Sequence, residues 1–212
     1  MRLAALVGLN VAPVNIVSAN NKDVLLIERF DRELKNTDWA RKAMVSALTL
    51  FELDKLQACY ASYETLAEIV RLRFTDPKGT LKELFSRLVF NILCGNTDDH
   101  ARNHGAFWNG NDLSLTPAYD ICPQSRAGGE ASQAMLIENN GNNHSKLSNC
   151  MRVAGNFQLK EEAARDIIEH QLAVIEKHWG DVCDEAELSQ VDQRLFWKRQ
   201  FLNPFAFEGY NW

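Results

Sequence analysis

A strongly apolar helical pattern over residues 81–93 constrains the fold of this chain more than any other feature. Apolar residues recur there at spacings of three and four, which is the periodicity of an α-helix. They occupy more than one face of that helix: Leu81, Leu84, Phe85, Leu88, Val89, Ile92 and Leu93. A helix that is apolar on several faces must be surrounded by other elements. We therefore expect a central, largely buried helix that delivers the chain to Gly95.

Other helical patterns are available to surround it. Thr75-Asp76-Pro77 marks a break before the central helix, and an earlier helix is predicted from residue 61. In that earlier helix Leu66, Ile69, Val70 and Arg73 share a face. Further helical patterns cover residues 2–8 (ending at Gly8), 145–155, 160–179 and 185–202.

Two β-hairpins are also predicted. The β-rich runs 14–18 and 24–30 flank a turn-prone segment, and an Asn-Gly turn at 109–110 separates the apolar runs 106–108 and 113–116. Residues 33–60 are expected to form a loop plus a short helix. The polar segment 124–144 is expected to be a mobile loop. The predicted fold class is α+β and predominantly α.

Composition excludes several classes of protein. Apolar residues make up 46% of the 212-residue chain and charged residues 24%, as in ordinary globular proteins. The net charge of -5 and the absence of a Lys/Arg run of four argue against direct binding of nucleic acid. No apolar run approaches the ~18 residues of a membrane-spanning helix. Five widely spaced cysteines without a CxxC pair indicate reduced thiols. We expect a cytoplasmic protein.

The central helix leads into Gly95-Asn96-Thr97-Asp98-Asp99-His100-Ala101-Arg102-Asn103, and Asp120 follows the second hairpin. Protein kinases use the same order: a catalytic Asp, a magnesium-binding Asn five residues later, and a metal-binding Asp. Asp98 is the candidate to orient or deprotonate an acceptor hydroxyl. The side-chain oxygens of Asn103 and Asp120 suit Mg²⁺, which prefers oxygen ligands.

Two other interpretations remain open at this point. Asn and Asp are common in turns, so the segment can be a polar loop held by its own side chains. His100 and His104, with Asp98 and Asp99, can also supply zinc ligands. Two histidines four positions apart share a face only on a helix. Asn103 and Gly105 are poor helix residues, so this spacing gives the zinc hypothesis little support.

Three segments together carry a family resemblance: Ile27-Glu28-Arg29-Phe30-Asp31-Arg32, the loop 95–103, and Leu115-Thr116-Pro117-Ala118-Tyr119-Asp120. In order and spacing the chain resembles the C-terminal domain of the HipA family from about residue 1 to 180. These proteins are bacterial serine/threonine kinases that act as toxins of type II toxin–antitoxin modules. The resemblance implies a protein-kinase-like C-terminal lobe.

The resemblance also implies roles for particular residues. Asp98 matches the catalytic aspartate, and Asn103 and Asp120 match the magnesium ligands. Glu28 and Phe30 match the interlobe hinge that contacts adenine, while His100 and Tyr119 match positions lining the nucleotide site. The implied cofactors are ATP and Mg²⁺. The family phosphorylates a serine on a target protein such as an aminoacyl-tRNA synthetase, and a DNA-binding antitoxin restrains it.

The chain departs from a complete family member at its start. Lys22 is the only lysine before the hinge-like segment, so the N-terminal lobe with its phosphate-binding lysine is expected to be missing. We expect residues 1–32 to be a remnant of that lobe and the hinge. Residues 33–203 then form the helical lobe, and 204–212 an aromatic tail that packs back or docks elsewhere. Another chain can supply the lobe.

Three functions follow as hypotheses. The first is an ATP- and Mg²⁺-dependent protein kinase that needs an N-terminal lobe in cis or in trans. The second is an inactive lobe that binds other proteins, such as an antitoxin. The third is a small-molecule phosphotransferase, since choline and aminoglycoside kinases use a similar Asp and Asn loop.

Overall fold

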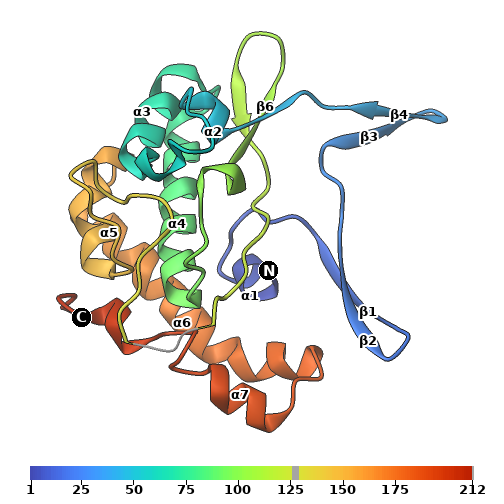
Figure 1. The fold of residues 1–212 in the computed structure, drawn as a ribbon, viewed down its shortest axis with the longest axis vertical. Coiled ribbons are helices and arrows are strands. Elements are labelled where there is room, and N and C mark those ends of the chain that lie inside the picture. The colour runs from blue at the N-terminus through green and yellow to red at the C-terminus, as the bar shows by residue number, and fades with distance from the viewer. Residues whose placement is uncertain (126–128, 212) are drawn as a thin grey trace.

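Helix α4, Pro77–Cys94, lies at the centre of the molecule in the computed structural model, which describes residues 1–125 and 129–211 (Figure 1). Asp76 caps its first turn, because Asp76 Oδ1 accepts a hydrogen bond from the Gly79 N–H at 3.0 Å. Pro77 occupies the first helical position, where its missing N–H costs nothing. The apolar residues of the predicted pattern are all buried. The central, buried helix expected from the sequence is therefore confirmed.

The other helices surround α4. Helices α3, α5 and α6 and the 3₁₀ segment η3 all contact it, and α1 packs on α6. The bounds are α1 Arg2–Leu6, α2 Ala47–Leu50, η1 Ala58–Tyr60, α3 Tyr63–Arg73, η2 Ala101–Asn103, α5 Leu147–Val153, η3 Ala154–Phe157, α6 Glu161–Glu185, α7 Gln190–Phe196 and η4 Pro204–Phe207. Helix α6 is longer, and α7 shorter, than the sequence predicted.

Among the described residues, no helix combines the length and the apolar character that crossing a membrane requires.

The described strands form three small antiparallel sheets. Strands β1 and β2 pair in one hairpin, β3 and β4 in a second, and β5, β6 and β7 in that order in a third sheet. Their bounds are β1 Val14–Ala19, β2 Lys22–Ile27, β3 Arg32–Lys35, β4 Asp38–Arg41, β5 Met44–Ser46, β6 Gly105–Trp108 and β7 Leu113–Leu115. Both predicted hairpins are present, although β2 ends at Ile27 rather than Phe30.

The expectation of a loop plus a short helix for residues 33–60 was partly wrong, because it missed the β3–β4 hairpin. Its strands read Arg-Glu-Leu-Lys and Asp-Trp-Ala-Arg, so they lack the apolar alternation that marks a half-buried strand. The turn is made by Asn36, whose φ of 57° lies in the left-handed region that Asn tolerates. Exposed charged strands of this kind carry little signal in the sequence.

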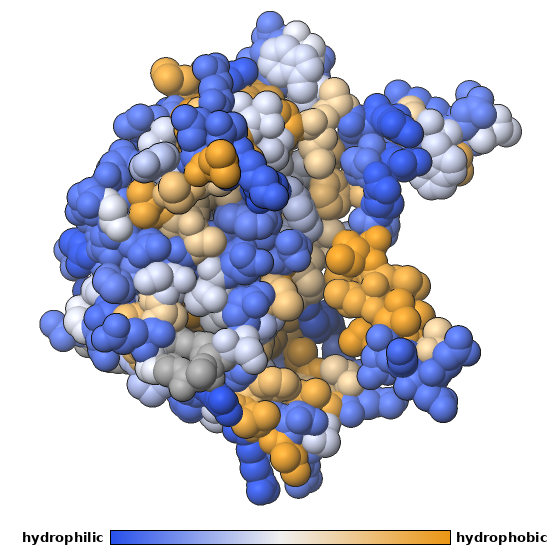
Figure 2. Space-filling model, in the orientation of Figure 1, coloured by the Kyte–Doolittle hydropathy of each residue, from blue (hydrophilic) through white to orange (hydrophobic). Residues whose placement is uncertain are grey.

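The first two hairpins extend away from the helical body (Figure 1). Hairpin β1–β2 exposes Ile16, Val24, Leu25, Leu26 and Ile27, each 38–52% accessible to solvent. Figure 2 shows a continuous apolar surface on this projecting hairpin. The hairpin thus presents a cluster of apolar side chains outside the helical core.

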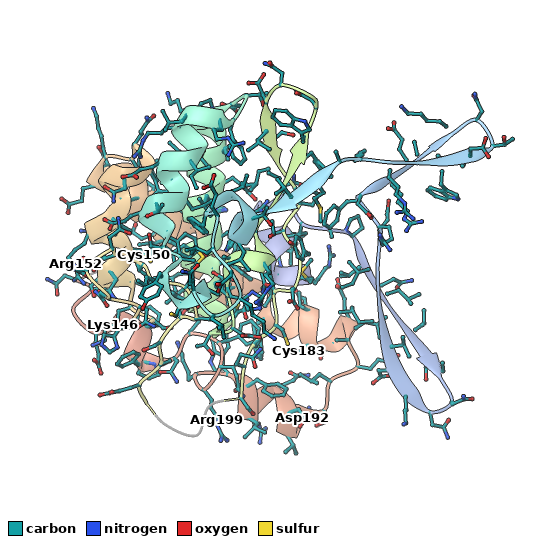
Figure 3. The ribbon with its side chains drawn as sticks, turned by 45° about the horizontal axis from the view of Figure 1, so that its top comes forward. Lys146, Cys150, Arg152, Cys183, Asp192 and Arg199 are labelled. Carbon is teal, nitrogen blue, oxygen red and sulfur yellow. The ribbon has the colours of Figure 1, made fainter. Side chains whose placement is uncertain are left out.

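Two irregular segments pack on the body. In the predicted mobile loop, Met135 and Ile137 are buried, and Leu136 exchanges backbone hydrogen bonds with Ala61 and Tyr63 at the start of α3. The aromatic tail packs back on the helices, with Phe205 and Tyr210 buried. Lys146 lies beside it and its Nζ forms an ion pair with Glu208 Oε2 at 2.7 Å (Figure 3). Residues 126–128 of that loop and Trp212 of the tail lie outside the described residues.

Candidate active site

The predicted catalytic loop begins at Gly95, which ends α4 in the left-handed conformation with φ 71°. A Cβ atom at this position would lie 2.5 Å from the backbone oxygen of Gln200, so both the conformation and the space require glycine. Next along the loop, the Asn96 N–H donates to the Asn91 carbonyl at 2.8 Å, and Asn96 Nδ2 donates to Asn91 Oδ1 at 3.1 Å. The loop therefore leaves the core in a fixed direction.

Asp98 and Asn103 are joined within this loop. Asn103 is buried and its Nδ2 donates a weak hydrogen bond to the Asp98 carbonyl oxygen at 3.4 Å. That contact uses the amide nitrogen and leaves Asn103 Oδ1 without a protein partner among the described residues. The carboxylate of Asp98 is exposed and likewise makes no hydrogen bond or ion pair with them. Both oxygen-bearing groups are thus free to bind a ligand.

The segment that bears Asp120 contacts this loop. Its neighbour Tyr119 donates a hydrogen bond from its hydroxyl to the carbonyl oxygen of Arg102 at 2.6 Å, one residue before Asn103. Asp120 itself adopts φ 58°, a left-handed conformation that is uncommon outside glycine. Its exposed carboxylate has no hydrogen bond or ion pair with any described residue. Burial, and then the charge of Asp120, raise the pKa of the Tyr119 hydroxyl.

The predicted nucleotide-site residues are only partly brought together. The Phe30 ring lies 5.5 Å from the Tyr119 ring and 6.1 Å from the Phe107 ring, centroid to centroid. His100 lies in the loop, and its buried Nδ1 has no hydrogen-bond partner among the described residues. Glu28 stands apart: its N–H donates to the Pro13 carbonyl, and its side chain lines a hollow with Arg29, Arg32, Leu34 and Trp39.

A second, buried set of side chains lies behind the loop. Asp99 binds His104 Nε2 at 3.0 Å and also accepts a hydrogen bond from the Tyr63 hydroxyl of α3. Burial acts to raise the pKa of Asp99, but attraction to His104 and the hydrogen bonds from His104 and Tyr63 outweigh it and lower that pKa. Burial, and then the charge of Asp99, raise the pKa of Tyr63 well above its ordinary value.

This buried set bears on the two metal hypotheses. Asp99 and His104 contact each other and Tyr63, whereas Asp98 is exposed, so the four residues proposed as zinc ligands are divided between the interior and the surface. Within the described ranges no group of three or more His, Cys, Asp or Glu side chains is arranged to hold a metal ion. Asn103 and Asp120 offer one neutral and one charged oxygen, which fits Mg²⁺ that keeps waters and phosphate oxygens as its other ligands.

Sequence reasoning missed two contributors to the site. Tyr63 could not be found, because its contact with Asp99 spans 36 positions and no local pattern signals it. Arg87 did leave a signal, since a charged residue interrupts the apolar run of α4. It is buried and pairs with Glu83 one helical turn away, Nε to Oε1 at 2.8 Å.

Comparison with known proteins agrees with this geometry. A family model described as the HipA-like C-terminal domain matches residues 1–179. The chain belongs to this family. Among curated proteins, the serine/threonine-protein kinase toxin HipA of Shewanella oneidensis is 26% identical over an alignment of 139 residues that covers 57% of this chain and 32% of that protein. The resemblance to the HipA C-terminal domain inferred from the sequence is confirmed.

Solved structures support the fold. HipA of Shewanella oneidensis MR-1, in a complex with HipB and operator DNA, superposes with a TM-score of 0.75 at 19% identity and covers 92% of this chain. The Helicobacter pylori proinflammatory kinase CtkA gives a TM-score of 0.59 at 15% identity over 98% of the chain. The predicted α+β, predominantly helical HipA-like fold is therefore confirmed. The chain spans 50% of the solved HipA chain and 32% of the curated relative.

Proposed function

We propose that this chain is the catalytic lobe of a HipA-like serine/threonine protein kinase that transfers a phosphoryl group from ATP to a serine of a target protein. One observation supports this proposal above the others. The carboxylates of Asp98 and Asp120 are both exposed and make no hydrogen bond or ion pair with a described residue, and Asn103 uses only its amide nitrogen in its hydrogen bond to Asp98. Two exposed carboxylates and one buried amide oxygen are thereby left without a protein partner among the described residues.

Each residue then has a chemical role. Asp98 orients the acceptor hydroxyl and accepts its proton, while Asn103 and Asp120 hold Mg²⁺. The ion neutralises the phosphate charge when it is bound. Tyr119 and His100 line the nucleotide site. The hinge segment that begins at Glu28 reaches this site through Phe30, whose ring lies against the ring of Tyr119. The left-handed conformation of Asp120 is strain of the kind that functional sites retain.

The proposal includes a second lobe, supplied by the same polypeptide or by another chain. Hairpin β1–β2 exposes four consecutive apolar residues from Val24 to Ile27. Because successive side chains of a strand point to opposite faces, both faces of the hairpin are apolar. An isolated two-stranded hairpin is marginally stable in water, so a sheet-containing lobe that covers both faces would complete it. This lobe would also close over the nucleotide site next to Phe30.

Further features of the proposal come from the family. A DNA-binding antitoxin is the proposed restraining partner, in line with the HipB that accompanies the solved HipA structure. The antitoxin, rather than this acidic chain, would then contact DNA. The target serine is proposed to lie on a protein such as an aminoacyl-tRNA synthetase, and the five free cysteines suit a cytoplasmic protein.

The direct test is a titration of Mg²⁺–ATP into the chain joined to its second lobe. Asp120→Ala should weaken binding by at least about tenfold because it removes a charged metal ligand. Asp112→Ala is the matched control, since Asp112 lies in the β6–β7 turn and its carboxylate bonds only Asn111 among the described residues. Equal affinity in wild type and Asp120→Ala would refute the metal role.

The second candidate function is a binding module without catalysis. The exposed β1–β2 hairpin supports it as well as it supports the kinase lobe. The aromatic tail does not, since its described residues Phe205 and Tyr210 are packed on the body. Phosphorylation of a partner protein that is lost in Asp98→Ala, while binding to that partner survives, would exclude a purely binding role. The third hypothesis, a small-molecule phosphotransferase, is tested by measuring phosphoryl transfer to aminoglycosides and choline in place of a protein.

A further inference from the structure

Arg87 is a buried cation in the middle of the most apolar helix of the chain, 3% accessible to solvent. A buried charge is costly unless it is paired and hydrogen-bonded. Its Nε is paired with Glu83 at 2.8 Å, and its Nη2 donates to two backbone oxygens, Thr116 at 2.9 Å and Asn10 at 3.2 Å. The side chain therefore joins α4 to two segments that are distant in sequence.

Those two segments pair with each other at the same point. The Asn10 carbonyl accepts the Ala118 N–H at 2.7 Å, and the Ala12 N–H donates to the Ala118 carbonyl at 2.9 Å. Glu83 Oε1 also accepts the Asn10 N–H at 3.2 Å. The Arg87–Glu83 pair thus binds both backbone groups of Asn10 and fixes the strand-like pairing that ends two residues before Asp120.

Stability alone does not account for this arrangement. Arg87 Nη1 is buried and has no hydrogen-bond partner among the described residues, which is a destabilising feature. Burial also lowers the pKa of Arg87 from its ordinary value, which reflects the cost of keeping the charge inside. A buried ion pair with an unsatisfied donor is weak evidence for a stabilising role. A positional role explains why the guanidinium is there.

We propose that Arg87, together with Glu83, is a positioning residue that sets where Asp120 stands relative to Asn103 and thereby sets the affinity for the divalent cation. This inference rests on the proposed function. The carboxylate of Asp120 has no hydrogen bond of its own to a described residue, so its position depends on the backbone around it, which is held by the pairing at Ala118 and by the Tyr119 hydroxyl on the Arg102 carbonyl. Groups that orient metal ligands without touching the metal typically change metal affinity about 10–100-fold when they are removed.

Lysine cannot replace arginine in this role. The planar guanidinium reaches Glu83 with Nε and two carbonyls with Nη2, in a fixed fork. An ammonium group keeps the charge but is a compact point charge without that fork. Arg87→Lys is therefore a mild variant that separates charge from geometry, and Arg87→Met removes both.

The experiment compares wild type, Arg87→Lys, Arg87→Met and a matched control, Arg71→Met. Arg71 also reaches from a helix to a backbone oxygen, Nη1 to the Asn156 carbonyl at 2.6 Å, but in a segment that does not lead to Asp120. Two quantities are measured on the chain itself. One is the amide hydrogen exchange of Ala12 and Ala118. The other is the affinity for Mn²⁺ alone, from paramagnetic broadening of the Asp120 resonances.

Both Arg87 variants should speed exchange at Ala12 and Ala118 at least about tenfold, because their pairing opens more readily. Both should also weaken Mn²⁺ binding by about 10–100-fold, while Arg71→Met changes neither quantity. Faster exchange with unchanged Mn²⁺ affinity would reduce Arg87 to a structural residue and overturn the proposal. If Arg87→Met does not fold, Arg87→Lys decides. Absence of Mn²⁺ binding at Asp120 in the wild type contradicts the proposed function instead.

Discussion

The helical body and the projecting β1–β2 hairpin use apolar residues in opposite ways. In α4 the apolar side chains are almost completely removed from water, and the loop that bears Asp98 follows directly after this packed helix. In the hairpin, residues of the same type from Val24 to Ile27 remain about half accessible and contact mainly the partner strand. The body buries its apolar residues within itself, whereas the hairpin has the composition of a buried strand but leaves its apolar residues exposed.

The largest expected effect comes from truncating the same side chain in the two regions. Leu88→Ala in α4 should lower the free energy of unfolding by roughly 2–5 kcal/mol, because it leaves a cavity in a closed core. Leu25→Ala in β2 should change it by no more than about 0.5 kcal/mol, since no cover is lost. Urea denaturation of the chain alone measures both. Comparable losses would show that the hairpin is already packed in the isolated chain.

Gly95→Ala tests how rigidly the body holds the loop of residues 95–103. The substitution combines a left-handed φ with a collision against the Gln200 backbone, and should cost roughly 1–3 kcal/mol or more. Gly209→Ala serves as control, because its φ of 73° matches and the added Cβ would make only an ordinary contact, 3.6 Å from Ser148 Oγ. The difference between their unfolding free energies isolates the collision. Equal costs would mean that the loop can move away from residue 200.

Tyr63→Phe tests the buried support behind the loop. It removes a donor to Asp99 and should destabilise the fold by roughly 1–3 kcal/mol at neutral pH. The folded pKa of Asp99 is lowered, so its stabilisation is present above the unfolded pKa of about 3.9 and is lost as the pH falls through the folded value. The variant should therefore unfold in acid at a higher pH than wild type. The exposed Tyr60, changed to Phe, should leave the acid transition in place.

The smallest expected effect is a difference in reactivity between the exposed and the buried thiols. Cys59 and Cys122 are exposed and should react quickly with a disulfide reagent at neutral pH. Burial raises the pKa of Cys94 to about 12 and also raises those of Cys150 and Cys183, so these three should react only after unfolding. Figure 3 shows Cys150 among the helices and Cys183 on α6. Rapid modification of more than two thiols in the native chain would indicate a looser body.

The same contrast explains how far the sequence could be interpreted. Leu81 to Leu93 predicted α4, and Asn109-Gly110 predicted the β6–β7 hairpin, because both signals are local. The Asp98, Asn103 and Asp120 set was visible from spacing, and their roles remain predictions. The β3–β4 hairpin was missed because exposed charged strands lack apolar alternation. The contacts of Tyr63 with Asp99 and of Arg87 with Thr116 depend on tertiary packing, so no local pattern could reveal them.

The most direct measurement of the central claim is phosphoryl transfer from Mg²⁺–ATP to a protein serine by the chain joined to its second lobe. Loss of a positioned general base typically costs about 10²–10⁴-fold, so Asp98→Asn should reduce the rate by at least about a hundredfold. Asp112→Asn, in the neighbouring turn, should leave the rate unchanged. Transfer that proceeds at the wild-type rate in Asp98→Asn would contradict the account.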